Sequence, residues 1–122
     1  MSKQLEQLLE QLKNAQEDVE FQDVIEVIND HYDYQPTLFT NGPEDTGVIN
    51  KAGENEGSCK IFSFARLQQL DEAQTLNCFG RYYREDVLKH PEKTDHQNIR
   101  TFIEYGWEHI DFDGSALEKI RD

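Results

Sequence analysis

Cys59 is the first candidate for chemistry in this sequence. It follows a glycine-containing loop in the segment NEGSCKIFSFARL, residues 55–67. A nucleophilic cysteine needs a base, usually a histidine, and a third group that orients the base. The sequence offers such groups in His96, Asp95, Asn98 and Asn55. The backbone N–H groups of residues 57 and 58 could then stabilise an oxyanion.

Cys59 also fits a purely structural role. Free cysteine is among the most buried residue types, and apolar residues follow this one closely. The polar side chains of the loop, Asn55, Glu56 and Ser58, would then bind one another or cap the next element. We favour this interpretation, in which the loop positions a core element, and we keep its three polar residues as candidate binding residues.

A divalent metal is the second chemistry to consider, because the segment HPEKTDHQN, residues 90–98, is rich in suitable side chains. The candidate ligands are His90, Asp95, His96, His31 and Glu56. Their spacing matches no helical pair of histidines four residues apart. A simpler explanation is that Pro91 ends one helix and that Thr94 and Gln97 form a capping box at the start of the next. We therefore expect no metal and no cofactor.

Tyrosines near the end of the second helix could form a recognition surface. Tyr32 and Tyr34 lie in the segment HYDY, and the later part of the chain adds Tyr82, Tyr83, Tyr105 and Trp107. Exposed together, such rings would dominate a binding site. Rings with hydrogen-bonded hydroxyls in the core are the alternative that we favour.

Two amphipathic helices are predicted at the start of the chain. Within residues 1–17, one stripe contains Leu5, Leu8, Leu9, Leu12 and Ala15, with Ser2 as the cap. Over residues 21–32, a second stripe contains Phe21, Val24, Ile25, Ile28 and Tyr32. The short joint at 17–20 predicts an antiparallel pair in which the leucine stripe docks on its own chain.

The middle of the chain is typical of turns and short strands. Residues 33–57 hold two prolines, four glycines and three asparagines. They predict a hairpin that pairs residues 37–40 with 47–50. For the following segment, a strand over residues 59–64 and a helix over 58–69 fit equally well.

The last third predicts more helices. Asp71 and Gln74 form a capping box for a helix over residues 72–89. A helix that opens at Thr94 would bury Ile99, Phe102, Ile103 and Trp107. The segment HIDF, residues 109–112, predicts a strand. Ser115 and Glu118 predict a capping box at the start of a short terminal helix. The fold class is therefore α+β, one domain over residues 1–122, with helices at both ends around a small sheet; an all-α fold with a long ordered loop is the alternative.

Composition and charge limit the function classes. The 122 residues carry a net charge of −13, with 3 Lys/Arg against 13 Asp/Glu in residues 1–57. Such a field repels nucleic acid and anionic membranes, so we expect neither, and it favours a basic protein or peptide as partner. No apolar run could span a membrane, and no signal peptide is evident. Two cysteines indicate a soluble cytoplasmic protein, and a monomer is favoured.

Several segments together resemble the HopJ type III effector family. They are HYDYQPTLFTNG, AGENEGSCKIFSFARL, LNCFGRYYREDVLKHPEKTDHQNIRTF and GWEHIDFDG. The resemblance covers residues 20–114 and leaves out the leucine-rich helix at 1–17. It implies a mixed α and β fold and a protein delivered into a host cell by type III secretion. It implies no catalytic residue, substrate or cofactor.

The sequence leaves two function classes open. We favour a non-enzymatic protein-interaction module. The alternative is a cysteine-dependent hydrolase or transferase that uses Cys59 and His96. An enzyme of this kind requires Cys59 and His96 to converge in one pocket, whereas an interaction module requires an exposed recognition surface.

Overall fold

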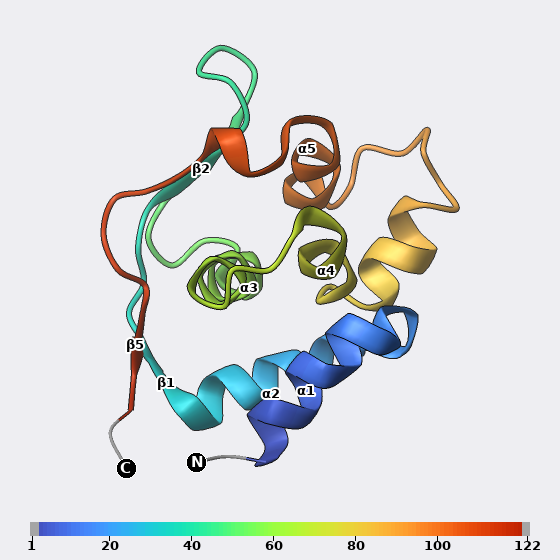
Figure 1. Cartoon of the computed structure of the whole chain (residues 1–122). Coiled ribbons are helices and arrows are strands. Elements are labelled where there is room, and N and C mark those ends of the chain that lie inside the picture. Colours follow the sequence, from blue (N-terminus) through green and yellow to red (C-terminus); the bar gives the residue numbers. More distant parts are fainter. Residues whose placement is uncertain (1–2, 121–122) are drawn as a thin grey trace.

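The computed structural model describes residues 3–120 as helices on one side and short strands on the other (Figure 1). The elements are α1 (Lys3–Asn14), η1 (Gln16–Asp18), α2 (Phe21–His31), β1 (Tyr32–Tyr34), β2 (Phe39–Asn41), β3 (Val48–Asn50), α3 (Glu56–Leu67), α4 (Glu72–Asn77), η2 (Tyr82–Val87), α5 (Gln97–Tyr105), η3 (Gly106–His109), β4 (Ile110–Phe112) and β5 (Leu117–Lys119). The predicted α+β class is confirmed. No helix among these residues is long and apolar enough to cross a membrane.

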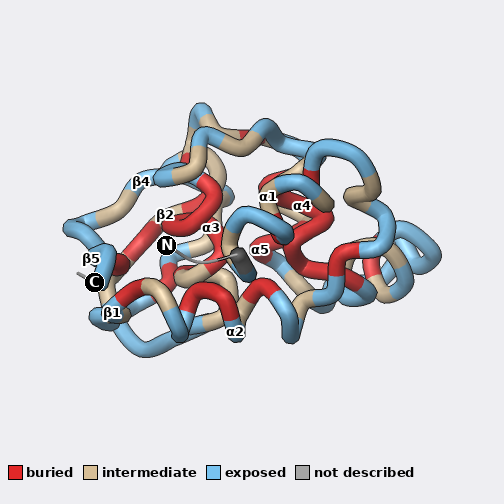
Figure 2. The backbone as a smooth tube through the Cα atoms, turned by 60° about the horizontal axis from the view of Figure 1, so that its bottom comes forward, coloured by how far each residue is buried: buried red, intermediate tan, exposed pale blue. Residues whose placement is uncertain are grey.

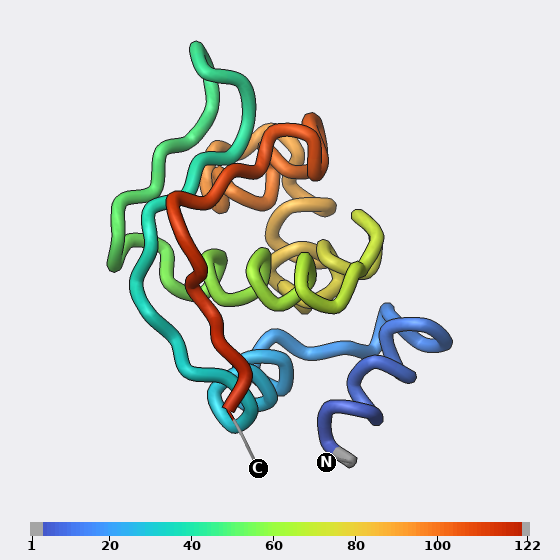
Figure 3. The backbone as a smooth tube through the Cα atoms, turned by 60° about the vertical axis from the view of Figure 1, so that its left-hand side comes forward, coloured from blue at the N-terminus to red at the C-terminus, as the bar shows by residue number. Residues whose placement is uncertain are grey.

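The leucine stripe of α1 is buried within its own chain. Leu8 and Leu12 are 4% and 1% exposed, and Leu5 and Leu9 pack at the margin of the same core. α1 contacts both α2 and α4, and Figures 1 and 3 show α1 and α2 side by side. Burying one leucine is worth about 1.5–3 kcal/mol, so the stripe fixes α1 to the domain. The predicted cap, Ser2, lies outside the described residues.

The strands form two small antiparallel sheets. The predicted hairpin is present as β2 and β3, but its first strand is Phe39–Asn41 rather than residues 37–40, with Phe39 opposite Asn50. β4 joins β2 on its other side. The predicted terminal helix is wrong, because Leu117–Lys119 form a strand that pairs with β1. Tyr32 also belongs to β1 rather than to the second helix. The pairing explains both differences, since each of these segments satisfies the backbone groups of the other.

α3 is the central helix of the molecule, and the strand alternative for this segment is wrong. Six of its residues are buried: Cys59, Ile61, Phe62, Ser63, Phe64 and Ala65. Other elements surround the helix on most sides (Figure 1), and Figure 2 shows that burial gathers on the inward sides of the elements. A helix that is covered on most sides has no polar face, so its sequence carries no clear period.

The segment 72–89 is not the single helix that its pattern predicts. The Asp71–Gln74 capping box is present, with Gln74 N donating to Asp71 Oδ1 at 2.7 Å. However, α4 ends at Asn77, and Gly80 adopts φ +60° before the π-helix η2 begins. A Cβ on Gly80 would lie 2.6 Å from the backbone nitrogen of Phe21. This close approach to the start of α2 requires glycine and breaks the helix.

α5 begins two residues later than the capping-box pattern predicts. His96, with φ +51°, directly precedes the helix, and the Gln97 amide donates to the Thr94 carbonyl instead of closing a box. Ile99 and Phe102 are buried as predicted, but Ile103 is 46% exposed. Ile103 is one position beyond the buried Phe102, about 100° further around the helix, and it faces away from the core.

Candidate functional site

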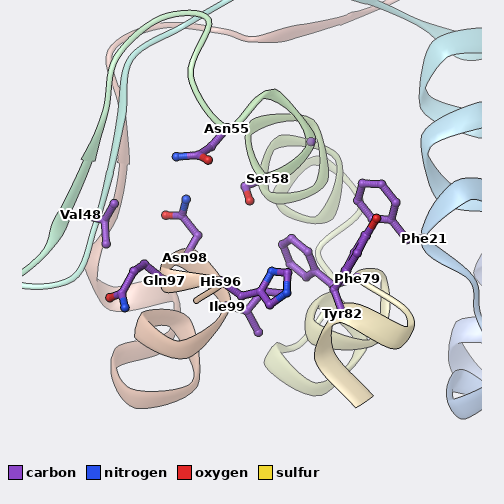
Figure 4. A pocket seen from close by; sticks show the side chains of 11 residues that line it. Phe21, Val48, Asn55, Ser58, Phe79, Tyr82, His96, Gln97, Asn98 and Ile99 are labelled. Atoms are coloured by element: carbon purple, nitrogen blue, oxygen red, sulfur yellow. The ribbon is translucent and has the colours of Figure 1, made fainter. Parts of the chain in front are cut away.

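A cleft of about 650 Å³ opens where the N-terminal ends of α3 and α5 approach each other (Figure 4). One wall is apolar and aromatic, and the other presents neutral polar side chains. The apolar wall contains Phe21, Phe79 and Tyr82, and the polar wall contains Asn55, Ser58 and Asn98. His96 and Val48 also line the cleft. The volume falls within the range of ordinary ligand sites, which is about 300–1,000 Å³.

A network of asparagine amides holds the polar wall in place. Asn98, at the start of α5, donates to Asn50 Oδ1 at 2.9 Å and accepts from the amides of Asn41 and Asn50, both at 3.1 Å. Asn55 donates to the same Asn50 oxygen at 2.6 Å. Because Asn41, Asn50 and Asn98 are buried, each of these bonds forms in a medium of low dielectric. The network ties both strands of the hairpin to the first turns of α3 and α5.

An aromatic row of three rings, Phe21, Tyr82 and His96, runs along the cleft. The Phe21 and Tyr82 centroids lie 5.1 Å apart at a steep angle, and the Tyr82 and His96 centroids lie 5.3 Å apart. His96 Nε2 is 3.1 Å from Asp86 Oδ2, which fixes the orientation of the imidazole. Tyr82 is 39% exposed although it is a large aromatic residue. The row therefore presents one accessible ring that two neighbours hold in position.

Both helices that meet at the cleft begin directly after a residue in the left-handed conformation. These residues are Asn55, with φ +49°, and His96, with φ +51°, and neither side chain caps its helix. The first-turn N–H groups of a helix have no partner within the helix and carry partial positive charge. The rim of the cleft thus offers hydrogen-bond donors next to the aromatic row.

Cys59 lies outside the cleft, although it directly follows Ser58. Its side chain is buried, and Sγ donates to the Thr37 carbonyl at 3.7 Å with Tyr34 beside it. Burial raises the pKa of the Cys59 thiol, and it also raises the pKa of Tyr34. The structure therefore does not bring Cys59 to His96, and it favours the thiol over the thiolate.

The structure brings some of the other candidates from the sequence together and separates the rest. Asn55, Ser58, His96 and Asn98 meet in the cleft. Glu56 is exposed in the first turn of α3. Tyr32 is a core ring against Phe64, and its hydroxyl accepts from Gln68 at 2.7 Å.

The three candidate metal ligands with the closest spacing each have another neighbour. His90 Nδ1 lies 3.7 Å from Glu92, His96 lies beside Asp86, and Asp95 binds Arg100 at 2.7 Å. Among residues 3–120, no group of three or more histidine, cysteine or acidic side chains could hold a metal ion.

Sequence reasoning missed part of the cleft. It did not select Asp86, Phe21 or Phe79 as site residues, and it took Asn41 and Asn50 only as turn formers. Asn41 and Asn50 end the two strands of the hairpin, so their polarity reads as turn chemistry. A useful signal would have been that a hairpin whose strands extend to residues 41 and 50 places both amides on the same side of the sheet.

Comparisons with known proteins give one family and one close structure. The model of the HopJ type III effector protein family matches residues 5–117. The crystal structure of VPA0580, a protein of unknown function, is 52% identical with a TM-score of 0.92, and the match covers 98% of this chain and 97% of that chain. No curated protein matches the chain. The family match begins at residue 5 rather than at residue 20, so it includes α1.

Proposed function

The chain belongs to the HopJ type III effector protein family, and we propose that it is a protein-interaction module that binds a segment of a partner protein in the cleft. One observation carries the proposal. A single cleft joins an accessible ring, Tyr82, to a row of amides that are already fixed by hydrogen bonds. Aromatic anchors supply binding energy, and fixed polar groups supply orientation.

The amide network lowers the entropic cost of binding. A loop that becomes ordered on binding loses part of the interaction energy to that ordering. Here Asn55 and Asn98 are held by Asn50 before any ligand arrives. A bound segment would meet donors and acceptors that are already placed.

The charge of the protein favours a basic partner. The net charge is −13, and the acidic residues Glu56 and Asp86 lie close to the cleft, the first next to Asn55 and the second beside His96. A segment with lysine or arginine would be attracted, whereas nucleic acid and anionic membranes would be repelled. We propose the monomer as the binding unit and the cytoplasm as its location, with type III secretion into a host cell as the route that the family name suggests.

We do not propose a reaction that depends on Cys59. A nucleophile and its base must lie within hydrogen-bond reach, and Cys59 instead donates to Thr37 away from the cleft that His96 lines.

A displayed library of random peptides, each about 12 residues long, tests the proposal. We expect selection on the wild-type protein to enrich peptides that combine an apolar or aromatic residue with lysine or arginine. Binding of an enriched peptide should weaken about tenfold or more in Tyr82→Ser, because aromatic anchors dominate such sites.

The matched control is Ile103→Ser, which removes an exposed apolar side chain of α5 that does not line the cleft. This variant should bind as the wild type does. Failure to enrich any peptide, or equal binding by Tyr82→Ser and the wild type, would contradict the proposal.

A further inference from the structure

The three-stranded sheet leaves one long side of β3 unpaired. The strand order is β3-β2-β4, so β3 pairs with β2 alone within residues 3–120, and Figure 3 shows β3 at the left-hand edge. The outer edge of β4 is partly occupied, since Arg66 donates to the Ile110 carbonyl at 2.8 Å. β3 is therefore the edge at which this sheet can accept another strand.

The hydrogen bonds between β2 and β4 fix which backbone groups face which neighbour. Gly42 N donates to the His109 carbonyl at 3.1 Å, and Asp113 N donates to the Leu38 carbonyl at 2.9 Å. Hydrogen-bonded pairs alternate with non-hydrogen-bonded pairs along antiparallel strands. The backbone of Thr40, midway between Leu38 and Gly42, thus faces β4, and its two neighbours in β2 face β3.

Ile49 is the residue whose backbone faces the free edge. The β2 residues that face β3 are Phe39 and Asn41, and they lie opposite Asn50 and Val48. Asn50 and Val48 therefore form the hydrogen-bonded pairs, and Ile49, between them, presents its N–H and carbonyl outward.

Internal bonds close this edge on either side of Ile49. Gly47 N donates to the Pro43 carbonyl at 2.6 Å, and Lys51 N donates to Glu54 Oε1 at 3.0 Å. The free part of the edge is therefore short, with Ile49 at its centre. Edge strands are often protected by lysine or proline, but Ile49 is apolar and 65% exposed.

The two faces of β3 lead to two different hollows. Val48 lines the cleft and also borders a second hollow of about 530 Å³, whereas Ile49 lines only the second hollow. Ile49, Thr40 and Asp111 share one face of the sheet, because Ile49 and Asp111 both lie opposite Thr40 in register. The second hollow contains the carboxylates of Glu44, Glu108 and Asp111, and no lysine or arginine lines it.

We propose that the partner segment binds as a short strand added to the free edge of β3, with one residue exchanging both backbone hydrogen bonds with Ile49. Side chains of a strand alternate between its two faces. The residue opposite Ile49 therefore lies over the acidic hollow, and we assign it as lysine or arginine. Its two neighbours in the segment face the cleft and are apolar or aromatic. This inference rests on the proposed function of the cleft.

Main-chain bonds and charge contribute unequally to this mode of binding. An added strand gains affinity from backbone hydrogen bonds and specificity from pockets for alternate side chains. The basic side chain extends over Ile49 towards carboxylates on the neighbouring strands, so its attraction acts over a distance comparable to the Debye length, roughly 8–10 Å. Loss of the backbone bonds should therefore weaken binding more than loss of the charge.

Ile49→Pro tests the backbone bond with little change to the fold. Proline removes the N–H that faces the free edge, and the hydrogen bonds to β2 belong to Val48 and Asn50. An enriched peptide should bind Ile49→Pro about tenfold more weakly or worse, and Ile49→Val should bind as the wild type does. Equal binding by Ile49→Pro and the wild type would overturn strand addition.

N-methylated peptides test the same bond from the partner's side, on the wild-type protein. Methylation at the residue that pairs with Ile49 should abolish binding, whereas methylation at either neighbour should be tolerated, because the neighbours turn their N–H groups away. This measurement decides the matter if Ile49→Pro does not fold. Equal effects at all positions would overturn strand addition.

The outcomes separate this inference from the function on which it rests. If Tyr82→Ser loses binding while Ile49→Pro and the methylated peptides retain it, the cleft binds partners and strand addition is wrong. If Tyr82→Ser binds as the wild type does, the proposed function fails as well. Replacing the central basic residue of the peptide by glutamine should weaken binding about threefold at low salt and less at high salt. If the glutamine peptide bound as tightly as the original peptide, the assignment of a basic residue opposite Ile49 would be wrong.

Discussion

Ser58 and Cys59 are neighbours in the sequence, yet α3 turns them into different surroundings. Ser58 lines the cleft with fixed amides and an accessible ring, whereas Cys59 is buried and donates to Thr37. The cleft is polar, pre-organised and open to a ligand. The Cys59 site, made of Cys59, Tyr34 and Thr37, is held by packing. A reactive type of side chain therefore marks the closed site, and unreactive amides mark the open one.

Position on a helix therefore decides which residues can act. Successive residues of an α-helix point about 100° apart, so one step along α3 leads from the cleft to the core. A cysteine after a glycine-containing loop resembles a nucleophile in sequence. Its chemistry depends on the direction in which the helix turns it, and that direction is set by the whole core.

The largest effect that separates the two regions should appear in stability. Asn98→Ala removes the amide that joins Asn41 and Asn50 and leaves buried polar groups without partners. We expect a loss of about 3 kcal/mol in the free energy of unfolding, because roughly 1 kcal/mol accompanies each lost bond and unsatisfied groups add to it. Cys59→Ala should lose only about 1 kcal/mol, close to the value of one buried methylene.

Urea unfolding of both variants, monitored by circular dichroism, measures these losses. If Cys59→Ala proved the more destabilising, the polar network would not be what holds the cleft together. The network would then be a consequence of packing around α3 rather than a cause of the local structure.

Sequence reasoning predicted the parts of the fold that carry a clear period or a turn signal. The leucine stripe of α1, the hairpin of β2 and β3, and the capping box at Asp71 were all readable. It failed where tertiary contacts override local preference. Gly80 breaks a helical pattern because α2 passes close to it. Leu117 becomes part of a strand because its segment pairs with β1, where it lies opposite Tyr34.

The site was predicted in fragments for the same reason. Asn55, Ser58, His96 and Asn98 were named as candidates, but for separate roles: Asn55 and Ser58 as binding residues of the loop, and His96 and Asn98 as catalytic residues. Nothing in the sequence connects residue 55 with residue 98. Their meeting depends on where α5 packs against the hairpin, which is a contact between distant parts of the chain.

Moving a thiol from the Cys59 site to the cleft should change its reactivity, which is a smaller effect than the loss of stability. In native protein, burial raises the pKa of Cys59 and also that of Cys78, to about 12, so both thiols should react slowly with a disulfide reagent at pH 8. Combining Cys59→Ala with Ser58→Cys moves a thiol to the cleft wall, near the start of α3. Exposure and the helix N-terminus both favour the thiolate there.

We expect the introduced thiol to react about tenfold faster or more than the wild-type thiols, measured as the rate of mixed-disulfide formation. Wild-type protein in urea provides the control rate for accessible thiols. If Cys59 reacts as fast as the introduced thiol, the closed description of the Cys59 site is wrong.

The smallest effect concerns the ion pair at the start of α5, between Asp95, which precedes the helix, and Arg100 within it. Arg100 donates to Asp95 at 2.7 Å and to its backbone carbonyl at 2.6 Å, and this hydrogen bond holds the pKa of Asp95 below its usual range. A depressed carboxyl pKa contributes stability above the pKa of the unfolded chain, and the contribution is lost as pH falls through the folded pKa. Because Asp95 is exposed, the effect on stability should be smaller than that of Cys59→Ala.

The pKa of Asp95 is a more sensitive observable than stability. A carbon-detected NMR titration of the Asp95 carboxyl should give a pKa below the usual range in the wild type. In Arg100→Gln, which keeps a polar side chain without the charge, the pKa should rise towards that range. Equal titration in both proteins would mean that the contact with Arg100 does not persist in solution. The start of α5 would then be held by the Asn98 amide and the His96–Asp86 contact, both of which belong to the cleft.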